Sequence, residues 1–285
     1  MSSSATGPIG RTDAIHALVR NVVDTRYEDM PEMAVDATKI FILDSLGVAI
    51  AGSLAPGVSE TLGVLRDWGG KRESTVLVSG EKLPAPSSAM MNSFLMHNQE
   101  FDCVHDLAVV HAFTTVLPVA IAVAEAQGGV TGREFLIAVA LGVDVASSIG
   151  ISSRSPIAHF RPGTAGAFGA VAAAGKIAGF DQATLSNAMG IVYSQICGTL
   201  QPHSEGAQVN SMQTGFNARA AVTAISLAAR GIQGASEVLE GRYGYFRLFE
   251  GEYDVEEALA NLGNVWQVEQ IGQKPFPCGR LTQGA

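Results

Sequence analysis

The residues best suited to chemistry gather in one short stretch of the chain, from His97 to His111. This stretch holds three of the six histidines and three carboxylates, in a chain where only 16% of residues are charged. A histidine beside a carboxylate is a common way to tune an acid–base group near neutral pH. On a helix, His97 and Glu100 would share a face, three residues apart. We interpret the stretch as an acid–base site; the simpler alternative is a solvated helix end and loop.

A metal site is a sharper interpretation of the same stretch, because Glu, Asp and His side chains can hold zinc or iron. However, the HExxH motif is absent from the sequence, and the spacing of these residues matches no standard ligand set. We therefore expect no metal ion at this site.

A second polar stretch precedes a glycine-rich segment. His159 and Arg161 stand just before Gly163–Gly169, which has neither the Gly-Lys-Ser/Thr ending nor the preceding strand of a phosphate loop. A helix that begins here could still bind an anion, such as a substrate carboxylate, at its N-terminus. Close packing of helices through small residues explains the glycines equally well, and both interpretations can hold together.

Two cations, Lys274 and Arg280, bracket the sequence Pro-Phe-Pro-Cys-Gly, which is typical of a rigid turn. Surface charges are usually only solvated, but an acidic protein with an acidic substrate needs a local positive group. The three cysteines are widely spaced and form no CxxC motif, so we interpret them as packing residues. They are Cys103, Cys197 and Cys278.

The elements that must position these residues are predicted to be almost all helical. The 32 glycines sit together with alanines in helical patterns, which allows buried helices to approach closely. Thr131 and Glu134 form a capping box. The apolar periodicity predicts helices over about 13–23, 33–51, 59–68, 88–101, 114–127, 131–147, 165–178, 181–197, 212–230 and 255–262. Strands and helices do not alternate, which disfavours a doubly wound sheet.

Strand character is confined to two segments, 74–79 and 265–271. A single strand is rarely stable alone. The second segment therefore either pairs with one such as 74–79, or belongs to a domain that is mostly missing. We expect an all-α domain over 1–264 and the beginning of a truncated domain over 265–285.

Composition narrows the class of protein further. The net charge is −9 with no basic run, which argues against nucleic acid as a partner. The longest apolar runs fall short of the ~20 residues of a membrane span, and the first residues do not resemble a secretion signal. The cysteines are few and their spacing suggests no disulfide pairing, which is typical of a protein in a reducing compartment. We expect a cytoplasmic protein that binds neither nucleic acid nor a membrane.

Several motifs in this order resemble the MmgE/PrpD family. The matching segments are Glu100-Phe-Asp102, Val109-Val-His111, Gly163-Thr-Ala-Gly-Ala-Phe-Gly169, Gly215-Phe-Asn-Ala-Arg-Ala-Ala221, Val238-Leu-Glu-Gly241 and Lys274-Pro-Phe-Pro-Cys278. The resemblance implies a large all-α domain followed by a smaller α+β lid, a homodimer, and no organic cofactor. It also implies acid–base chemistry at a carbon next to a carboxylate. Against the family's length of about 450 residues, most of the lid is missing here.

Only some of the family's active-site residues are present at the matching positions of this sequence. The family's acidic motif Asp-Phe-Asp-Asp reads Glu100-Phe-Asp-Cys103, while His111 and Lys274 match the family's own residues. His159 lies one position from the family's second active-site histidine, with Phe160 in register. A lysine of decarboxylase-like members falls at Asn210. Two later histidines of the family read Gln213 and Gln283.

On these grounds we expect a lyase-like enzyme that dehydrates or decarboxylates a small di- or tricarboxylate. His111 is expected to move the proton, oriented by Asp102 or Glu100, with Lys274 as a further catalytic group. The expected substrate-binding residues are His159, Arg161, His105, Asn210, Gln213 and Arg280. Two alternatives stay open: an epimerase or isomerase acting on a related dicarboxylate, and an inactive helical module that only dimerises.

Overall fold

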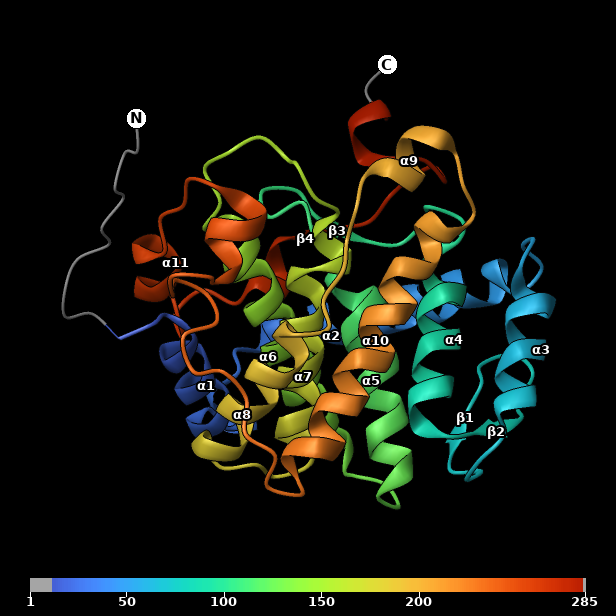
Figure 1. The fold of residues 1–285 in the computed structure, drawn as a ribbon, viewed down its shortest axis with the longest axis horizontal. Helices are drawn as coiled ribbons and strands as arrows, with labels where there is room; N and C mark the ends of the chain where they lie inside the picture. Colours follow the sequence, from blue (N-terminus) through green and yellow to red (C-terminus); the bar gives the residue numbers. More distant parts are fainter. Residues whose placement is uncertain (1–11, 284–285) are drawn as a thin grey trace.

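The computed structural model describes residues 12–283 and is built mainly of helices (Figure 1). Helix accounts for 60% of the described residues and strand for 4%, which confirms the predicted mainly α fold. The expectation that the N-terminal segment carries no secretion signal concerns residues 1–11, which lie outside the described part.

The predicted helices are found with ends that differ by a few residues, and the predicted capping box of Thr131 and Glu134 is present. The long helices are α1 (Ile15–Asp24), α2 (Glu32–Gly52), α3 (Val58–Trp68), α4 (Ala85–His97), α5 (Ala112–Ala126), α6 (Gly132–Ile151), α7 (Ala165–Ile177), α8 (Gln182–Tyr193) and α10 (Val209–Ala228). The short elements are η1 (Tyr27–Asp29), η2 (Arg161–Gly163), α9 (Gln201–Glu205), the π-helical turn η3 (Phe246–Glu250), α11 (Glu256–Ala260), η4 (Gln267–Gln270) and η5 (Arg280–Thr282). The sequence patterns did not predict α9 or η3.

The centre of the molecule is formed by α5, α6 and α7, whose residues are mostly buried (Figure 1). Gly142 of α6 and Gly169 of α7 let these two helices meet backbone to backbone. A Cβ atom added to Gly142 would lie 2.7 Å from the Gly169 carbonyl oxygen, and one added to Gly169 would lie 2.4 Å from the Gly142 carbonyl oxygen. Small residues therefore have a packing role here, as the composition predicted.

Each of the two described sheets has only two short strands. β1 (Ser74–Thr75) pairs antiparallel with β2 (Lys82–Leu83), so the predicted strand 74–79 is limited to its first two residues. The chain turns immediately afterwards, because the Gly80 N–H donates to the Val76 carbonyl oxygen.

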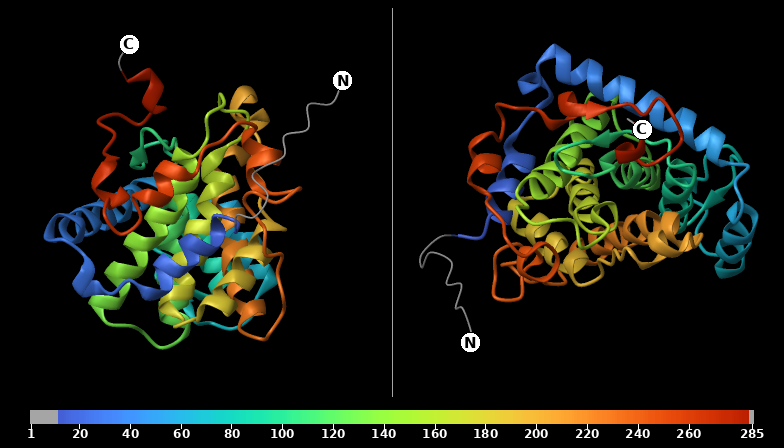
Figure 2. Two further views of the ribbon diagram at one scale, coloured as in Figure 1. Left: turned by 90° about the vertical axis from the view of Figure 1, so that its left-hand side faces the viewer. Right: turned by 90° about the horizontal axis from the view of Figure 1, so that it is seen from above.

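The predicted strand 265–271 is mostly wrong. Residues 267–270 form η4, and only β4 (Ile271–Gly272) is extended; it pairs antiparallel with β3 (Val104–His105) and not with 74–79. The physical reason is that polar groups of the helical part anchor this segment at Gln267. Its backbone N–H donates to the Asp144 carboxylate at 2.7 Å. The described end of the chain therefore crosses over α2 and α6 (Figure 2).

Within residues 12–283, one helix, α6, is long and apolar enough to cross a membrane by length and composition alone. However, 78% of its most apolar window is buried inside the fold, against α5 and α7. Its apolar surface is therefore satisfied by protein contacts, as in the core helix of a globular domain.

The anchor at Asp144 gives stability a specific dependence on pH. Burial raises the pKa of Asp144 from 3.8 to about 8, in spite of the hydrogen bond from Gln267. Between these two pH values the folded protein keeps a proton that the unfolded chain has released. The free energy of unfolding should therefore fall as pH rises from about 4 to about 8, and Asp144→Asn should remove this contribution.

Urea denaturation of both proteins across this pH range would measure the difference. The Asn side chain retains an oxygen to accept from Gln267, so the hydrogen bond itself can survive the substitution. Asp36→Asn, at an exposed position on α2, is the matched control and should keep the slope of the parent protein. An unchanged slope in Asp144→Asn would contradict the assignment.

Candidate active site

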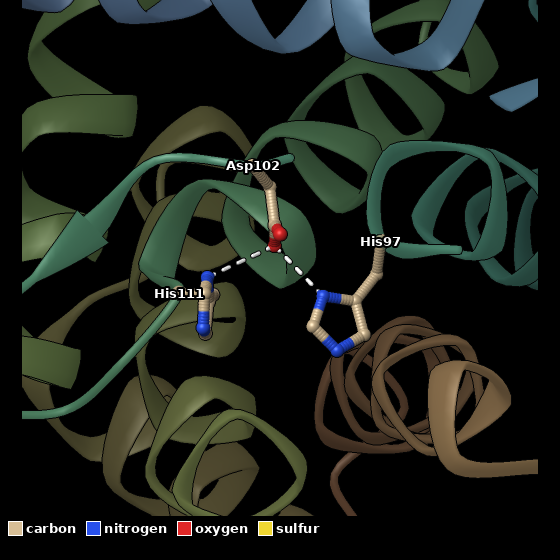
Figure 3. A group of neighbouring side chains, drawn as sticks. All are labelled: His97, Asp102 and His111. Carbon is tan, nitrogen blue, oxygen red and sulfur yellow. Dashed lines mark hydrogen bonds and ion pairs between the residues drawn. The ribbon is translucent and has the colours of Figure 1, made fainter. Parts of the chain in front are cut away.

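The end of α4, the start of α5 and the loop between them bring three polar side chains together (Figure 3). His97 is the last residue of α4, Asp102 lies in the loop, and His111 is the residue immediately before α5. A helix end and a helix start thus fix the two imidazoles, while the loop supplies the carboxylate between them.

The Asp102 carboxylate is the centre of this cluster. Its Oδ2 atom lies 2.8 Å from His97 Nδ1 and 3.1 Å from His111 Nδ1, and it also accepts a hydrogen bond from the Thr114 hydroxyl. His97 and Asp102 are fully buried, whereas the His111 side chain is 12% exposed. His111 is therefore the member of the pair of histidines that is open to solvent.

Glu100 and Lys274 complete the cluster from two distant parts of the chain. Lys274 Nζ donates to the Glu100 carbonyl oxygen at 2.9 Å, lies 3.3 Å from its carboxylate, and lies 3.6 Å from Asp102 Oδ1. Glu100 has a positive φ of 51°, a conformation that non-glycine residues seldom adopt. This strain turns both its carbonyl and its carboxylate toward the ammonium group, which is consistent with a functional site.

The charges of the cluster set the protonation of its members. Burial alone would raise the pKa of Asp102, but the neighbouring imidazoles of His111 and His97, with their hydrogen bonds, hold it well below its ordinary value. Burial and the Asp102 charge likewise oppose ionisation of Glu100, yet His97, His111 and Lys274 outweigh them and lower its pKa. Both carboxylates are therefore ionised near neutral pH.

The neighbours of His111 define which of its nitrogens is basic. Its Nδ1 atom lies 3.1 Å from the Cys103 carbonyl oxygen and 3.1 Å from Asp102, and both of these groups only accept hydrogen bonds. Nδ1 must therefore carry the proton in the neutral ring, which leaves the lone pair on Nε2. The arrangement resembles an imidazole oriented by a carboxylate for general base catalysis.

Among the described residues, His97, Asp102 and His111 place three donor atoms within 4.8 Å of one another, close enough to surround a metal ion. The fit to a metal is nevertheless poor. Both Nδ1 atoms already point at the same oxygen of Asp102, which Thr114 also contacts, and Lys274 provides positive charge beside the other oxygen. We therefore describe these residues as a hydrogen-bonded cluster.

Arg161 and His159 have partners elsewhere. The Arg161 guanidinium is buried in a two-pronged ion pair with Glu250, at 2.9–3.1 Å, and also donates to the Ala108 carbonyl oxygen. His159 Nδ1 lies 2.9 Å from the Phe249 carbonyl oxygen. Both therefore join the loop before α7 to the turn η3, and neither has a described contact with the Asp102 cluster.

The neighbour that does reach the cluster from this loop is Phe160, whose ring centroid lies 5.6 Å from that of His97. By the family resemblance, Phe160, one residue after His159, occupies the position of the family's second active-site histidine. The structure thus puts an aromatic ring against the cluster at this position, and it closes one side of His97.

His105 and Arg280 hold the C-terminal segment against the loop. His105 Nε2 lies 3.0 Å from the Gln267 side-chain oxygen, and burial lowers the pKa of His105, which keeps the ring neutral. Arg280 pairs with Asp106 at 3.0 Å, with both side chains exposed. These contacts hold the strand that leads to Lys274 against the loop between α4 and α5.

Gln213 and Asn210 lie near the start of α10. The Gln213 side-chain amide accepts a hydrogen bond from the Thr199 N–H at 2.7 Å and donates one to the Thr199 carbonyl oxygen at 3.0 Å. It also donates to the Asn210 amide oxygen at 3.4 Å. Gln213 therefore positions the loop before α9.

Sequence reasoning did not assign a role to two residues of the cluster, His97 and Thr114. For His97 a signal was present, since it lies five residues before Asp102 within the polar stretch. For Thr114 the sequence carried little signal of a functional role, because a threonine in an apolar helix is common. Its approach to Asp102 depends on how α5 begins.

The fold and the site together define a mainly α protein with a buried histidine–carboxylate–lysine cluster suited to acid–base chemistry. The chain belongs to the MmgE/PrpD family: the model of the MmgE/PrpD N-terminal domain matches residues 16–258.

Curated relatives support the same assignment. The chain is 29% identical over 272 residues to cis-aconitate decarboxylase of Aspergillus terreus. The aligned region covers 90% of this chain and 55% of that protein. It is 26% identical to the cis-aconitate decarboxylase-like protein oryM of Aspergillus oryzae, and 25% identical to cis-aconitate decarboxylase of Homo sapiens. These matches cover 90% and 94% of the chain, and 57% and 56% of the relatives. The chain thus spans about half the length of the curated relatives it matches.

Proposed function

We propose that this protein carries out lyase chemistry, dehydration or decarboxylation, on a small di- or tricarboxylate. The observation that carries the proposal is the pairing of His111 with Asp102 beside the buried Lys274. The names of the relatives support the class of reaction and of substrate.

In this mechanism, His111 Nε2 removes a proton from a carbon next to a substrate carboxylate, or returns one to it. Asp102 orients the ring and stabilises the imidazolium that forms. Lys274 adds positive charge from a buried position beside Glu100 and Asp102, which favours negative charge that develops close to the cluster. No organic cofactor or metal is needed for these steps.

Substrate carboxylates need positive partners, and the cations expected to bind them are already paired. Arg161 is paired with Glu250, Lys274 with Glu100, and Arg280 with Asp106. In addition, amides stand at Asn210 and Gln213, where the family comparison places a lysine and a histidine. An amide cannot replace a positive charge.

We therefore expect the purified chain to convert cis-aconitate and 2-methylcitrate slowly or not at all. Each electrostatic group that is missing from a site typically lowers the rate by about 10²–10³-fold. The measurement is an assay with both acids and with a panel of other small carboxylates in deuterated water, followed by proton NMR. Rapid conversion of either named acid would contradict this expectation.

The same assay tests the proposed function. Loss of water or carbon dioxide from a member of the panel supports a lyase; in a decarboxylation, deuterium also enters the product at the carbon that carbon dioxide has left. Deuterium incorporation with inversion and no loss identifies the alternative epimerase. The absence of both conversion and exchange with every member of the panel overturns the enzymatic proposal and favours the inactive helical module.

Two further expectations remain proposals: a cytoplasmic location and a homodimer. A stripe of apolar residues on the outer face of α2 motivates the second, since Met33, Ile40, Leu43 and Ile50 are each more than half exposed. Figure 2 shows α2 along one edge of the molecule. Light scattering would measure the number of chains in the particle.

A further inference from the structure

His97 is buried in a way that an ordinary core histidine is not. Its side chain has no exposed surface, and its ring packs against those of Phe160 and His111 with centroids 5.6 and 5.2 Å away. Burying a polar ring is costly unless its nitrogens are paired. The partners of those two nitrogens therefore define its chemical state.

Both ring nitrogens of His97 face carboxylate oxygens. Nδ1 lies 2.8 Å from Asp102 Oδ2, and Nε2 lies 3.5 Å from Glu100 Oε1. Nε2 is buried and has no hydrogen-bond partner among the described residues, and the Glu100 carboxylate lies within ion-pair distance of it. A neutral imidazole would turn a lone pair toward one of these two anions. A doubly protonated ring carries its positive charge between both of them.

The electrostatics agree with this geometry. Burial lowers the pKa of His97 and the Lys274 ammonium lowers it further, but the charge and hydrogen bond of Asp102 and the charge of Glu100 outweigh both and raise it. The position at the C-terminal end of α4 also favours a cation, because the helix dipole is negative there.

A protonated His97 balances the charge of the cluster. Asp102 and Glu100 contribute two negative charges, and Lys274 contributes one positive charge. His97 supplies the second positive charge, so His111 need not be charged for the cluster to be neutral. A base must be unprotonated before it can accept a proton.

We propose that His97 is a positioning residue: as a buried imidazolium it fixes Asp102 from the side opposite His111 and keeps His111 in its neutral, proton-accepting form. The ionisation of His97 stands independently of the reaction, whereas its effect on turnover rests on the proposed function. Asp102, Glu100, Lys274 and His111 are the charged or titratable groups that face it.

The first test is made on the unmodified protein and needs no substrate. In the chain labelled with ¹⁵N-histidine, long-range NMR correlations report which ring nitrogens carry protons. Near neutral pH we expect both nitrogens of His97 to be protonated, and only Nδ1 of His111. A neutral His97 would overturn the proposal. So would joint movement of the His97 and His111 signals on addition of Zn²⁺, which would make the three residues a metal site.

The second test uses His97→Asn, which places an amide donor near the former Nδ1 position but cannot carry a charge. His111 should then take up its second proton at a higher pH than in the parent protein, because a neighbouring positive charge is gone. His16→Asn, on α1 and outside the cluster, is the matched control and should leave the His111 signals unchanged. Identical pH dependence of the His111 signals in His97→Asn and in the parent protein would overturn the proposed coupling.

For turnover, measured as deuterium exchange into whichever acid the panel identifies, His97→Asn should move the acid limb of the rate profile to higher pH. On that limb the rate falls about tenfold for each pH unit of the shift, and recovers at high pH. kcat should change with little change in KM. A uniform loss at every pH would indicate a merely structural role and would overturn the proposal. Absence of both conversion and exchange in the parent protein would overturn the proposed function, while the NMR results would still decide the state of His97.

Discussion

Replacing His111 with alanine is expected to lower the rate of deuterium exchange by about 10²–10⁴-fold, the usual contribution of a positioned acid–base group. The reason is that His111 is the partly exposed histidine of the cluster, and its Nδ1 atom is held by two acceptors, which directs Nε2 to the substrate. The measurement is the initial exchange rate with the best substrate from the carboxylate panel.

The control for this variant is His16→Ala, which removes a histidine from α1, away from the cluster, and should keep the parent rate. Asp102→Asn should also slow the reaction, because an amide can point a donor at Nδ1 and lose the orientation of the ring. Unfolding curves of all three variants would separate loss of chemistry from loss of folding. If His111→Ala retained the parent rate while exchange remained measurable, His111 would not be the base.

A second large effect is expected on stability, from Arg161→Met. Arg161 and Glu250 have side chains only 5% and 2% exposed, and their contact is a two-pronged ion pair. Removing one partner of a buried pair leaves the other charge without compensation, which costs about 3–5 kcal/mol. The Tyr245 hydroxyl would remain as a donor to Glu250, since burial and the Glu250 charge hold its pKa well above its ordinary value.

Urea denaturation would measure this loss, and the chain offers a matched control in Arg280→Met. Arg280 also pairs with a carboxylate in the same geometry, but the Arg280 and Asp106 side chains are 37% and 53% exposed. Exposed pairs contribute about 0–1 kcal/mol, so this variant should lose little. The double variant Arg161→Met, Glu250→Leu should recover part of the stability. Equal losses for Arg161→Met and Arg280→Met would contradict the assignment of Arg161 to a structural pair.

The outcome also bears on substrate binding. Arg161 was expected from the sequence to bind a substrate carboxylate, and in the structure its guanidinium group is already occupied by Glu250. If the Arg161→Met variant were stable and had a raised KM, the result would indicate that Arg161 binds the substrate.

The sequence by itself determined the helical class and most helix positions, because apolar periodicity and caps act over three or four residues. The capping box of Thr131 is an example, since both of its partners lie in one turn. The concentration of His111 and Asp102 in one polar stretch was likewise visible, because ten residues of chain keep them near each other.

Only the tertiary structure decided which distant groups meet. Lys274 reaches Glu100 across 174 positions of the sequence, and no local pattern specifies that approach. The same holds for Arg161 and Glu250, 89 positions apart, and for the segment 265–271, which reads as a strand. Its anchor at Asp144 turns most of that segment into η4. These pairings depend on how α4, α5 and α6 pack, and packing is a property of the whole chain rather than of any one segment.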